Sequence, residues 1–264
     1  MAHPPAVRAG SAAPAPPPRA LEEPIHRLVL WNIDLTLVDV GRVTRAAYAD
    51  AFAAVTGRPL VRLPQTAGRT ESEMFFDALA LNEADSSAPV EEVLGEFSRE
   101  LASAFRARRS LLTEQGRILP GALAAVAEVG GLPGVVQTLL TGAIKPNAIE
   151  KLQAFALDRF FDTEIGGYGS EVFPKGALLL NARGRAAEKY GVEFAAEATV
   201  YIADSARDVA AAQIGGARSV AVASGRSSAA ELRDAGADVV LADLTDTANV
   251  VRAVECLTAP APTS

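Results

Sequence analysis

The chain has 264 residues, of which 49% are hydrophobic and 22% are charged, and its formal net charge is −7. This content is enough to bury a sizeable core, whereas the acidic balance argues against a nucleic-acid partner, which would need a basic patch to meet phosphates. The one cysteine, Cys256, rules out a disulfide within the chain, and no apolar run is long enough to span a bilayer. We therefore expect a cytoplasmic protein without a membrane partner; composition does not indicate an oligomeric state.

Residues 1–24 are rich in alanine and proline, with three successive prolines at 16–18. Such a segment buries too little apolar surface to offset the entropy that it would lose on ordering. We expect a disordered tail over these residues.

Short apolar runs bounded by polar residues predict buried parallel strands in five places along the chain. They fall at residues 26–34, 135–141, 199–204, 219–223 and 238–241. Stretches with helical spacing separate them, at residues 121–129, 146–155, 176–190, 207–215 and 228–234. Strands that alternate with helices require right-handed crossovers, so the pattern predicts an α/β fold with a doubly wound parallel sheet.

The segment 44–114 breaks this alternation. Its apolar residues have helical spacing at 45–55, 71–81 and 89–108, and it contains no convincing strand. We expect a helical cap domain over residues 44–114, inserted after the first strand and closing over the sheet. The α/β core domain would then consist of residues 25–43 and 115–264.

Polar residues cluster at the predicted carboxyl ends of the strands, where open α/β sheets form their binding sites. They are Asn32, Asp34, Thr141, Lys175, Asp204 and Asp208. Carboxylate oxygens suit Mg²⁺, whereas a hydroxyl and an ammonium group suit phosphate oxygens. Any one of these residues alone is more often a helix cap, a turn or a solvated surface group. Their shared placement predicts a joint site for Mg²⁺ and a phosphate group.

Four segments, in this order, resemble the motifs of the haloacid dehalogenase (HAD) hydrolases, in particular the phosphoglycolate-phosphatase-like branch. They are Asn32-Ile33-Asp34-Leu35-Thr36-Leu37, Leu139-Leu140-Thr141-Gly142, Lys175, and Ala203-Asp204-Ser205-Ala206-Arg207-Asp208. The sequence Gly68-Arg69-Thr70 resembles a cap-loop motif of this branch. The likeness covers about residues 28–247, and it implies a Rossmann-like HAD core with a cap.

The resemblance implies a phosphatase-type reaction on a small phosphorylated metabolite, with Mg²⁺ as cofactor. The residue at position 32 would attack phosphorus, and Asp34 would act as acid and base. Thr141 and Lys175 would hold the phosphoryl group. The implied substrate contacts are Thr36, Gly142, Arg69 and Thr70. The implied metal ligands are Asn32, Asp34, Asp204 and Asp208. Arg69 can equally be a surface residue at the start of a helix.

The chain departs from this family at several positions. Asn32 stands where the family has its nucleophilic aspartate, Leu35 and Ala203 replace glycines, and Ala143 stands where the branch often has asparagine. An amide oxygen is a poor nucleophile, and loss of the nucleophile from another covalent hydrolase lowers kcat by about 10⁶. The lost charge should also weaken Mg²⁺ binding.

Two functional hypotheses follow from these departures. The chain is a working hydrolase that uses Asp34 or an activated water, or it is a non-catalytic relative that binds a phosphorylated metabolite or a protein partner. A third hypothesis keeps only the fold and treats the retained polar residues as residual.

Overall fold

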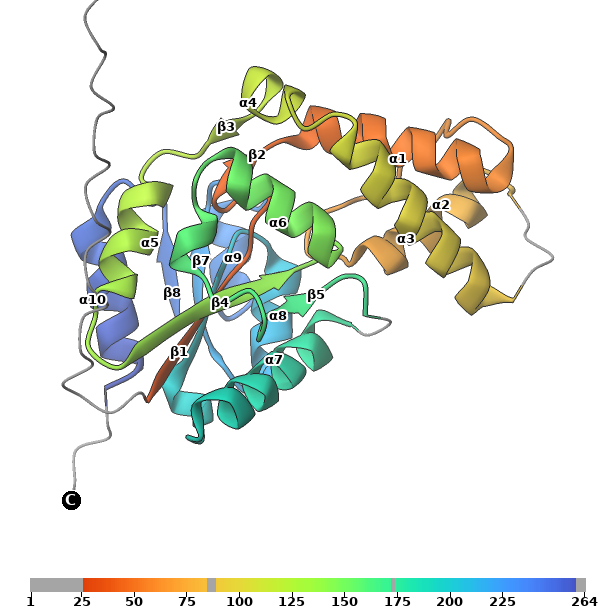
Figure 1. Cartoon of the computed structure of the whole chain (residues 1–264). Coiled ribbons are helices and arrows are strands. Elements are labelled where there is room, and N and C mark those ends of the chain that lie inside the picture. The colour runs from red at the N-terminus through yellow and green to blue at the C-terminus, as the bar shows by residue number, and fades with distance from the viewer. Residues whose placement is uncertain (1–25, 85–88, 172–173, 260–264) are drawn as a thin grey trace, which may run out of the picture.

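The computed structural model describes residues 26–84, 89–171 and 174–259 (Figure 1). The expected tail at residues 1–24 lies outside these ranges. The centre of the molecule is a sheet of six parallel strands in the order β5-β4-β1-β6-β7-β8. The strands are β1 (Arg27–Trp31), β4 (Val135–Thr141), β5 (Gly167–Tyr168), β6 (Thr199–Ala203), β7 (Arg218–Val222) and β8 (Val239–Leu241). The predicted α/β class with a parallel sheet is therefore confirmed.

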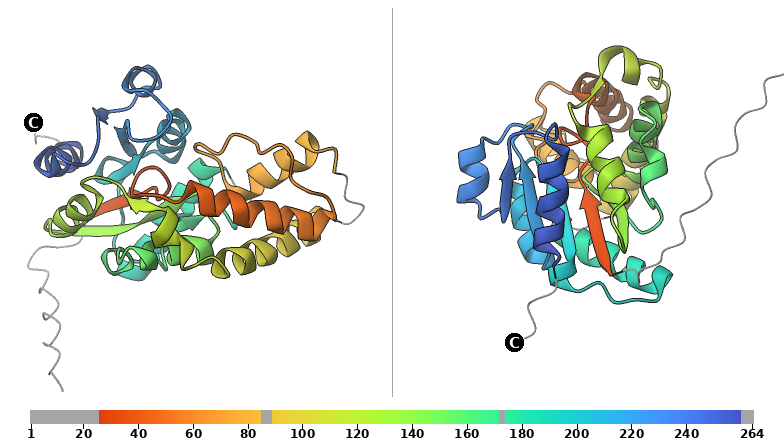
Figure 2. Two further views of the ribbon diagram at one scale, coloured as in Figure 1. Left: turned by 90° about the horizontal axis from the view of Figure 1, so that it is seen from above. Right: turned by 90° about the vertical axis from the view of Figure 1, so that its left-hand side faces the viewer.

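Helices cover both faces of the sheet. On one face lie α5 (Ala122–Gly130), α6 (Lys145–Ala154) and α10 (Thr247–Leu257), and on the other lie α7 (Lys175–Tyr190), α8 (Ala206–Gly215) and α9 (Ala229–Asp234). Alternate side chains of a strand point to opposite faces. Accordingly, Val29 and Trp31 pack with α5, α6 and α10, whereas Leu28 and Leu30 pack with α7 and α8. Figure 2 shows the sheet between these two helical layers.

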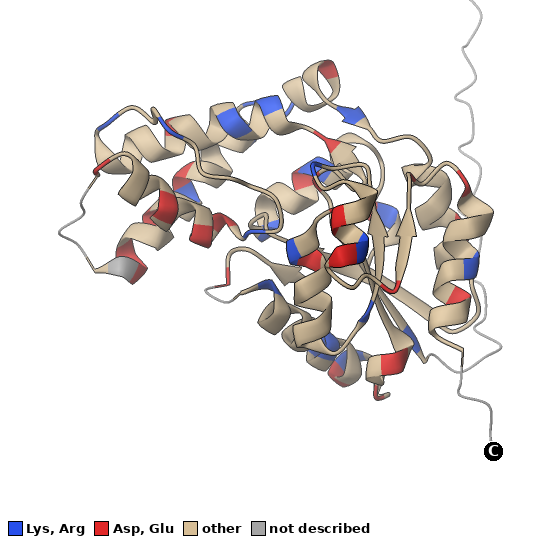
Figure 3. Cartoon of the chain, turned by 180° about the vertical axis from the view of Figure 1, so that it is seen from behind, with Lys and Arg blue, Asp and Glu red and all other residues tan. Residues whose placement is uncertain are grey.

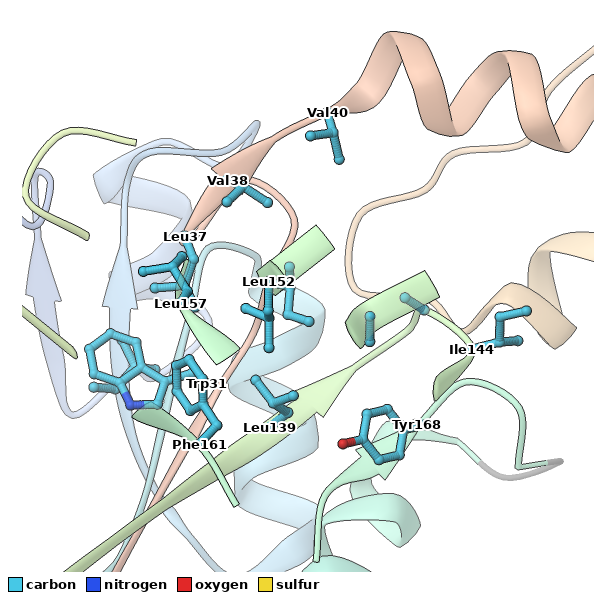
Figure 4. Packing of buried hydrophobic residues seen from close by; sticks show 14 of the residues in the cluster. Trp31, Leu37, Val38, Val40, Leu139, Ile144, Leu152, Leu157, Phe161 and Tyr168 are labelled. Atoms are coloured by element: carbon cyan, nitrogen blue, oxygen red, sulfur yellow. The ribbon is translucent and has the colours of Figure 1, made fainter. Parts of the chain in front are cut away.

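Trp31 belongs to the core. Its side chain is fully buried near Leu139 and Phe161 (Figure 4). The indole Nε1 donates a hydrogen bond of 2.9 Å to Oε1 of Gln137 on β4, so the buried polar atom is satisfied. This packing fixes the end of β1, and with it the position of the adjacent Asn32.

The helices α1 (Gly41–Thr56), α2 (Glu71–Leu81), α3 (Val90–Arg106) and α4 (Leu111–Gln115) occupy the segment predicted to be helical. A short antiparallel pair, β2 (Val38–Asp39) and β3 (Arg117–Ile118), joins this segment to the rest of the chain. The helices project to one side of the sheet (Figures 1 and 2). Their centre is aromatic, and the rings of Phe75 and Phe97 stack with centroids 4.1 Å apart. Phe76 is partly buried and packs against the same cluster.

The predicted core elements are confirmed, and β4 has the predicted bounds. The strands β2, β3 and β5 are not predicted by the pattern, because a strand of two residues has no periodicity to detect. Within the described ranges, no helix combines the length and apolar character needed to cross a membrane.

Candidate active site

A cavity of about 380 Å³ lies between the carboxyl ends of the strands and the helices α1 and α2. The predicted site residues that line it are Asn32, Asp34, Arg69, Gly142, Lys175 and Asp204. The predicted residues that do not line it are Thr36, Thr70, Thr141 and Asp208. Five distant stretches of chain therefore meet at one cavity, and the placement of Asn32, Gly142 and Asp204 at strand ends accounts for their part in it.

The Asn32 amide is fixed by hydrogen bonds on both of its polar atoms. Its Nδ2 donates to the main-chain oxygen of Asp34 at 2.8 Å, to Oγ1 of Thr36 at 3.1 Å and to Oδ1 of Asp204 at 2.9 Å. Its Oδ1 accepts from Nζ of Lys175 at 3.2 Å. The surroundings assign the orientation of the amide, because three acceptors face one end and an ammonium group faces the other.

Lys175 is buried, and its ammonium group finds three acceptors. Besides Asn32, Nζ donates to Oδ1 of Asp208 at 2.7 Å and to the hydroxyl of Tyr201 at 3.2 Å. Asp208 lies in the first turn of α8, where its other carboxylate oxygen accepts from Oγ of Ser205 at 2.5 Å. Asp208 is thus a partner that positions Lys175, and it does not reach the cavity itself.

Asp204 is a buried carboxylate at the end of β6. Burial and, second, the nearby charge of Asp208 raise its pKa to about 7, although the hydrogen bonds from Thr36 and Asn32 and the charge of Lys175 lower it. The side chain sits close to the loop after β7, since a Cβ on Gly225 would meet its Oδ2 at 1.9 Å. Only glycine at position 225 leaves room for this carboxylate.

Asp34 is held by Lys151, a residue that the sequence did not single out. Nζ of Lys151 donates to both carboxylate oxygens of Asp34, at 2.9 and 2.7 Å. The lysine side chain is 1% exposed, whereas the Asp34 side chain is 40% exposed and lines the cavity. A lysine in the middle of a helix is normally read as a surface residue. Here α6 places it under the cavity, with its ammonium 5.5 Å from the ring of Phe105.

Glu71 is a second buried acid that sequence reasoning missed. It is the first residue of α2, and its Oε2 accepts a hydrogen bond of 2.6 Å from the backbone N–H of Ile144. Burial, with a smaller contribution from the charge of Asp34, raises its pKa to about 7, although the charge of Lys151 and the hydrogen bond from Ile144 lower it. The position directly after the predicted Arg69-Thr70 pair was the available signal.

The loop that carries Arg69 and Thr70 closes against the strand ends. A Cβ on Gly142 would lie 1.9 Å from the Arg69 main-chain oxygen, so this approach requires glycine. Arg69 lines the cavity and pairs with Asp77. Thr70 is instead the N-cap of α2 in a capping box with Glu73. Thr141 Oγ1 accepts from the Ala143 N–H at 3.2 Å and so closes its own turn.

Leu35 occupies the turn after β1 in the left-handed region, with φ of 60°. Its N–H donates to the oxygen of Val38 at 2.8 Å, and its own oxygen accepts from Oγ of Ser224 at 2.7 Å. A residue with a Cβ is strained in this region by roughly 1–2 kcal/mol. The replacement of the family's glycine by Leu35 therefore leaves the turn in place at an energetic cost.

The arrangement does not fit the Mg²⁺ that the resemblance implies. Within residues 26–84, 89–171 and 174–259, no three His, Cys, Asp or Glu side chains gather so that they could hold a metal ion. The carboxylates of Asp34 and Asp208 are taken by lysines, and an amide N–H₂ faces Asp204. Turning the Asn32 amide over to present oxygen would aim its hydrogens at the Lys175 ammonium.

A sequence profile described as haloacid dehalogenase-like hydrolase matches residues 29–213. The chain belongs to this family. A second profile, described as HAD-hydrolase-like, matches residues 180–247 of this HAD-like hydrolase. A comparison with curated protein sequences returned no match.

Several solved structures show the same fold. A predicted phosphatase from Clostridium acetobutylicum has a TM-score of 0.61 at 16% identity, covering 86% of this chain and 99% of its own. The structure of CbbY from Rhodobacter sphaeroides in complex with phosphate has a TM-score of 0.58 at 21% identity, and the match covers 84% of this chain and 96% of CbbY. The structure of a predicted phosphoglycolate phosphatase from Haemophilus somnus has a TM-score of 0.57 at 18% identity, and the match covers 85% of this chain and 97% of that one. At such identities the likeness establishes the fold alone.

Proposed function

We propose that this HAD-like hydrolase binds a small phosphorylated metabolite in its cavity and lacks turnover through an aspartyl-phosphate. The observation that carries the proposal is the charge of the cavity lining. Its basic residues are Arg45, Arg69, Lys151, Lys175 and Arg226, and its acidic residues are Asp34, Asp39, Glu71 and Asp204. Since the pKa of Glu71 and of Asp204 is raised to about 7, neither acid is fully ionised at neutral pH. The lining is then net positive.

This local charge differs from that of the whole chain, whose formal net charge is −7. Acidic and basic residues are interspersed over the helices of the molecule (Figure 3). A cavity with an excess of ammonium and guanidinium groups suits an anion with several oxygens, such as a phosphate monoester. The buried Nε of Arg69 has no hydrogen-bond partner within the described residues, so a ligand oxygen would satisfy it.

Asn32 argues against the family's covalent route. The side chain of Asn32 is a neutral amide, whose oxygen is a poor nucleophile, and its Oδ1 also accepts a hydrogen bond from Lys175. By analogy with other covalent hydrolases, the loss of the nucleophile lowers kcat by about 10⁶, or roughly 8 kcal/mol of barrier. The proposal involves no metal ion, because the amide and the two lysines occupy the acceptors that a metal would need.

A second candidate function is slow hydrolysis by a water molecule that Asp34 activates. The observation that favours it is the exposure of the Asp34 carboxylate to the cavity, at 40%. A carboxylate in this position could accept a proton from an attacking water, a contribution of typically 10²–10⁴-fold. Lys151 would hold the carboxylate in place.

The helices α1 to α4 act in this proposal as the cap over the cavity, with the division at residues 44–114 against 25–43 and 115–264. α1 supplies Tyr48 to the lining, α2 supplies Glu71, and the preceding loop supplies Arg69. Exchange of ligand would require this loop to move away from Gly142.

Calorimetric titration with inorganic phosphate, together with phosphate release from a generic phosphomonoester, tests the proposal. We expect saturable binding and no turnover above the uncatalysed rate. Absence of binding would overturn the proposal. Turnover that Asp34→Asn abolishes would establish the second candidate instead.

A further inference from the structure

Two residues of α1 that line the cavity carry hydroxyl groups with no hydrogen-bond partner among the described residues. Thr44 and Tyr48 lie four residues apart, on one face of the helix, and both line the cavity. The Tyr48 side chain is 1% exposed. Neither Oγ1 of Thr44 nor the hydroxyl of Tyr48 is bonded within the described residues. A buried hydroxyl without a partner costs about 1–3 kcal/mol, so such groups normally have a ligand or a water to bind.

Glu71 extends this pair across the cavity from α2. Its carboxyl group is buried and lines the cavity, and only Oε2 is taken by the Ile144 N–H. Burial raises the pKa of Tyr48, and the charge of Glu71 raises it further, so the phenol keeps its proton and is a donor. The three side chains thus offer two hydroxyls, which donate and accept, and one carboxyl group that accepts.

We infer that Thr44, Tyr48 and Glu71 form a second subsite, which binds hydroxyl groups on the organic part of a phosphate ester. The ligand class is a polyol or sugar phosphate, in contrast to an alkyl or aryl phosphate. The inference rests on the proposed function, because it assumes that the phosphate group lies at the Lys175 end of the same cavity. The cavity of about 380 Å³ is in the usual range for small-molecule sites.

The chemistry of the subsite selects hydroxyl over other groups. An alkyl or aryl group would leave the Thr44 and Tyr48 hydroxyls unsatisfied. An ammonium group would be attracted by Glu71 but repelled by the buried ammonium of Lys151, whose charge already reaches Glu71. A hydroxyl can donate to Glu71 and accept from Tyr48, and it meets no repulsion.

Titration calorimetry with sorbitol 6-phosphate, hexyl phosphate and inorganic phosphate tests the subsite. The first two probes have six carbons each and differ in their hydroxyl groups. We expect Tyr48→Phe and Thr44→Val each to weaken the binding of sorbitol 6-phosphate about tenfold, which corresponds to one lost hydrogen bond. Neither substitution should change the affinity for hexyl phosphate. Tyr190→Phe is the matched control, because its hydroxyl bonds Asp162 outside the cavity.

The outcomes separate the two proposals. If Tyr48→Phe weakens both esters equally, or neither, the hydroxyl subsite is wrong while the phosphate site stands. If wild-type protein binds none of the three probes, the phosphate site itself fails, and the subsite with it. The melting temperature of each variant without ligand verifies that the fold is intact.

Discussion

Nδ2 of Asn32 donates a hydrogen bond of 2.9 Å to Oδ1 of Asp204, across the gap between the ends of β1 and β6. The same nitrogen also reaches the main-chain oxygen of Asp34. The amide group of Asn32 therefore satisfies, by hydrogen bonding, oxygens that would otherwise need a cation between them. These oxygens are held together without a metal ion.

Asn32→Asp should convert this arrangement into a cation site. The substitution removes the donor and places a second carboxylate against Asp204, so without metal we expect a loss of about 3 kcal/mol in unfolding free energy. Mg²⁺ should then raise the melting temperature of the variant and leave that of the wild type unchanged, because only the variant offers two facing carboxylates. Thermal denaturation with 0 and roughly 5 mM Mg²⁺, a range in which sites of this kind fill, measures both effects.

Asn249→Asp at the start of α10 controls for a general effect of added negative charge, since it lies outside the cavity lining. Equal Mg²⁺ responses in wild type and Asn32→Asp would contradict the view that the amide replaces a cation.

Lys151→Met should weaken phosphate binding and affect stability little. The ammonium is buried under the cavity, and its loss removes one positive charge from the lining, so we expect about tenfold weaker binding of inorganic phosphate. Unfolding free energy should change by less than about 1 kcal/mol, because methionine fills similar volume and Asp34 can be hydrated. Lys189→Met is the control, since Lys189 pairs with Asp162 at the surface. Unchanged phosphate affinity in Lys151→Met would remove this lysine from the site.

Leu35 and Leu37, two leucines of one turn, should differ in how much stability is lost when each is replaced by a smaller residue. Leu35 has φ of 60°, and Leu35→Gly relieves strain of about 1–2 kcal/mol, which offsets the apolar contact and chain entropy that it loses. Leu37 is fully buried, so Leu37→Ala should cost about 2–5 kcal/mol. Urea denaturation of both variants measures the contrast. A loss above about 3 kcal/mol in Leu35→Gly would mean that the side chain matters more than the backbone strain.

The sequence was sufficient to predict the parallel sheet and the meeting of polar residues at the ends of its strands. Short apolar runs locate β1, β4, β6 and β7, the strands of five or more residues, and the parallel arrangement brings Asn32, Lys175 and Asp204 to one cavity. The pattern carries this information because buried parallel strands are continuously apolar, and because their polar boundary residues lie at the same edge.

The other half of the cavity was not readable from sequence. Lys151, Tyr48 and Glu71 lie within ordinary helical stretches, where a charged residue is normally solvated and a tyrosine normally packs in a core. Their role depends on how α1 and α2 close over the strand ends, and such tertiary packing leaves no periodic signal. Thr70 and Thr141 were predicted as site residues from their positions in the motifs. In the structure, Thr70 caps α2 and Thr141 bonds within its own turn.

The raised pKa of Glu71 should appear as a pH dependence of stability. Its pKa is about 7 in the folded protein and near 4.5 in the unfolded chain, so the folded state binds the proton more tightly. The resulting stabilisation is fully present below pH 4.5 and is lost as pH rises to about 7, a change on the order of 3 kcal/mol.

Glu71→Gln cannot ionise but still accepts from Ile144, so it should lack this contribution. Asp204, whose pKa is also raised, lowers the unfolding free energy over the same pH range in wild type and in Glu71→Gln, so its contribution cancels when the two proteins are compared. Urea denaturation at pH 5 and pH 8 should therefore show a smaller fall in unfolding free energy for Glu71→Gln than for wild type. Equal falls would mean that Glu71 is ionised in the folded protein, with Lys151 as its counter-charge.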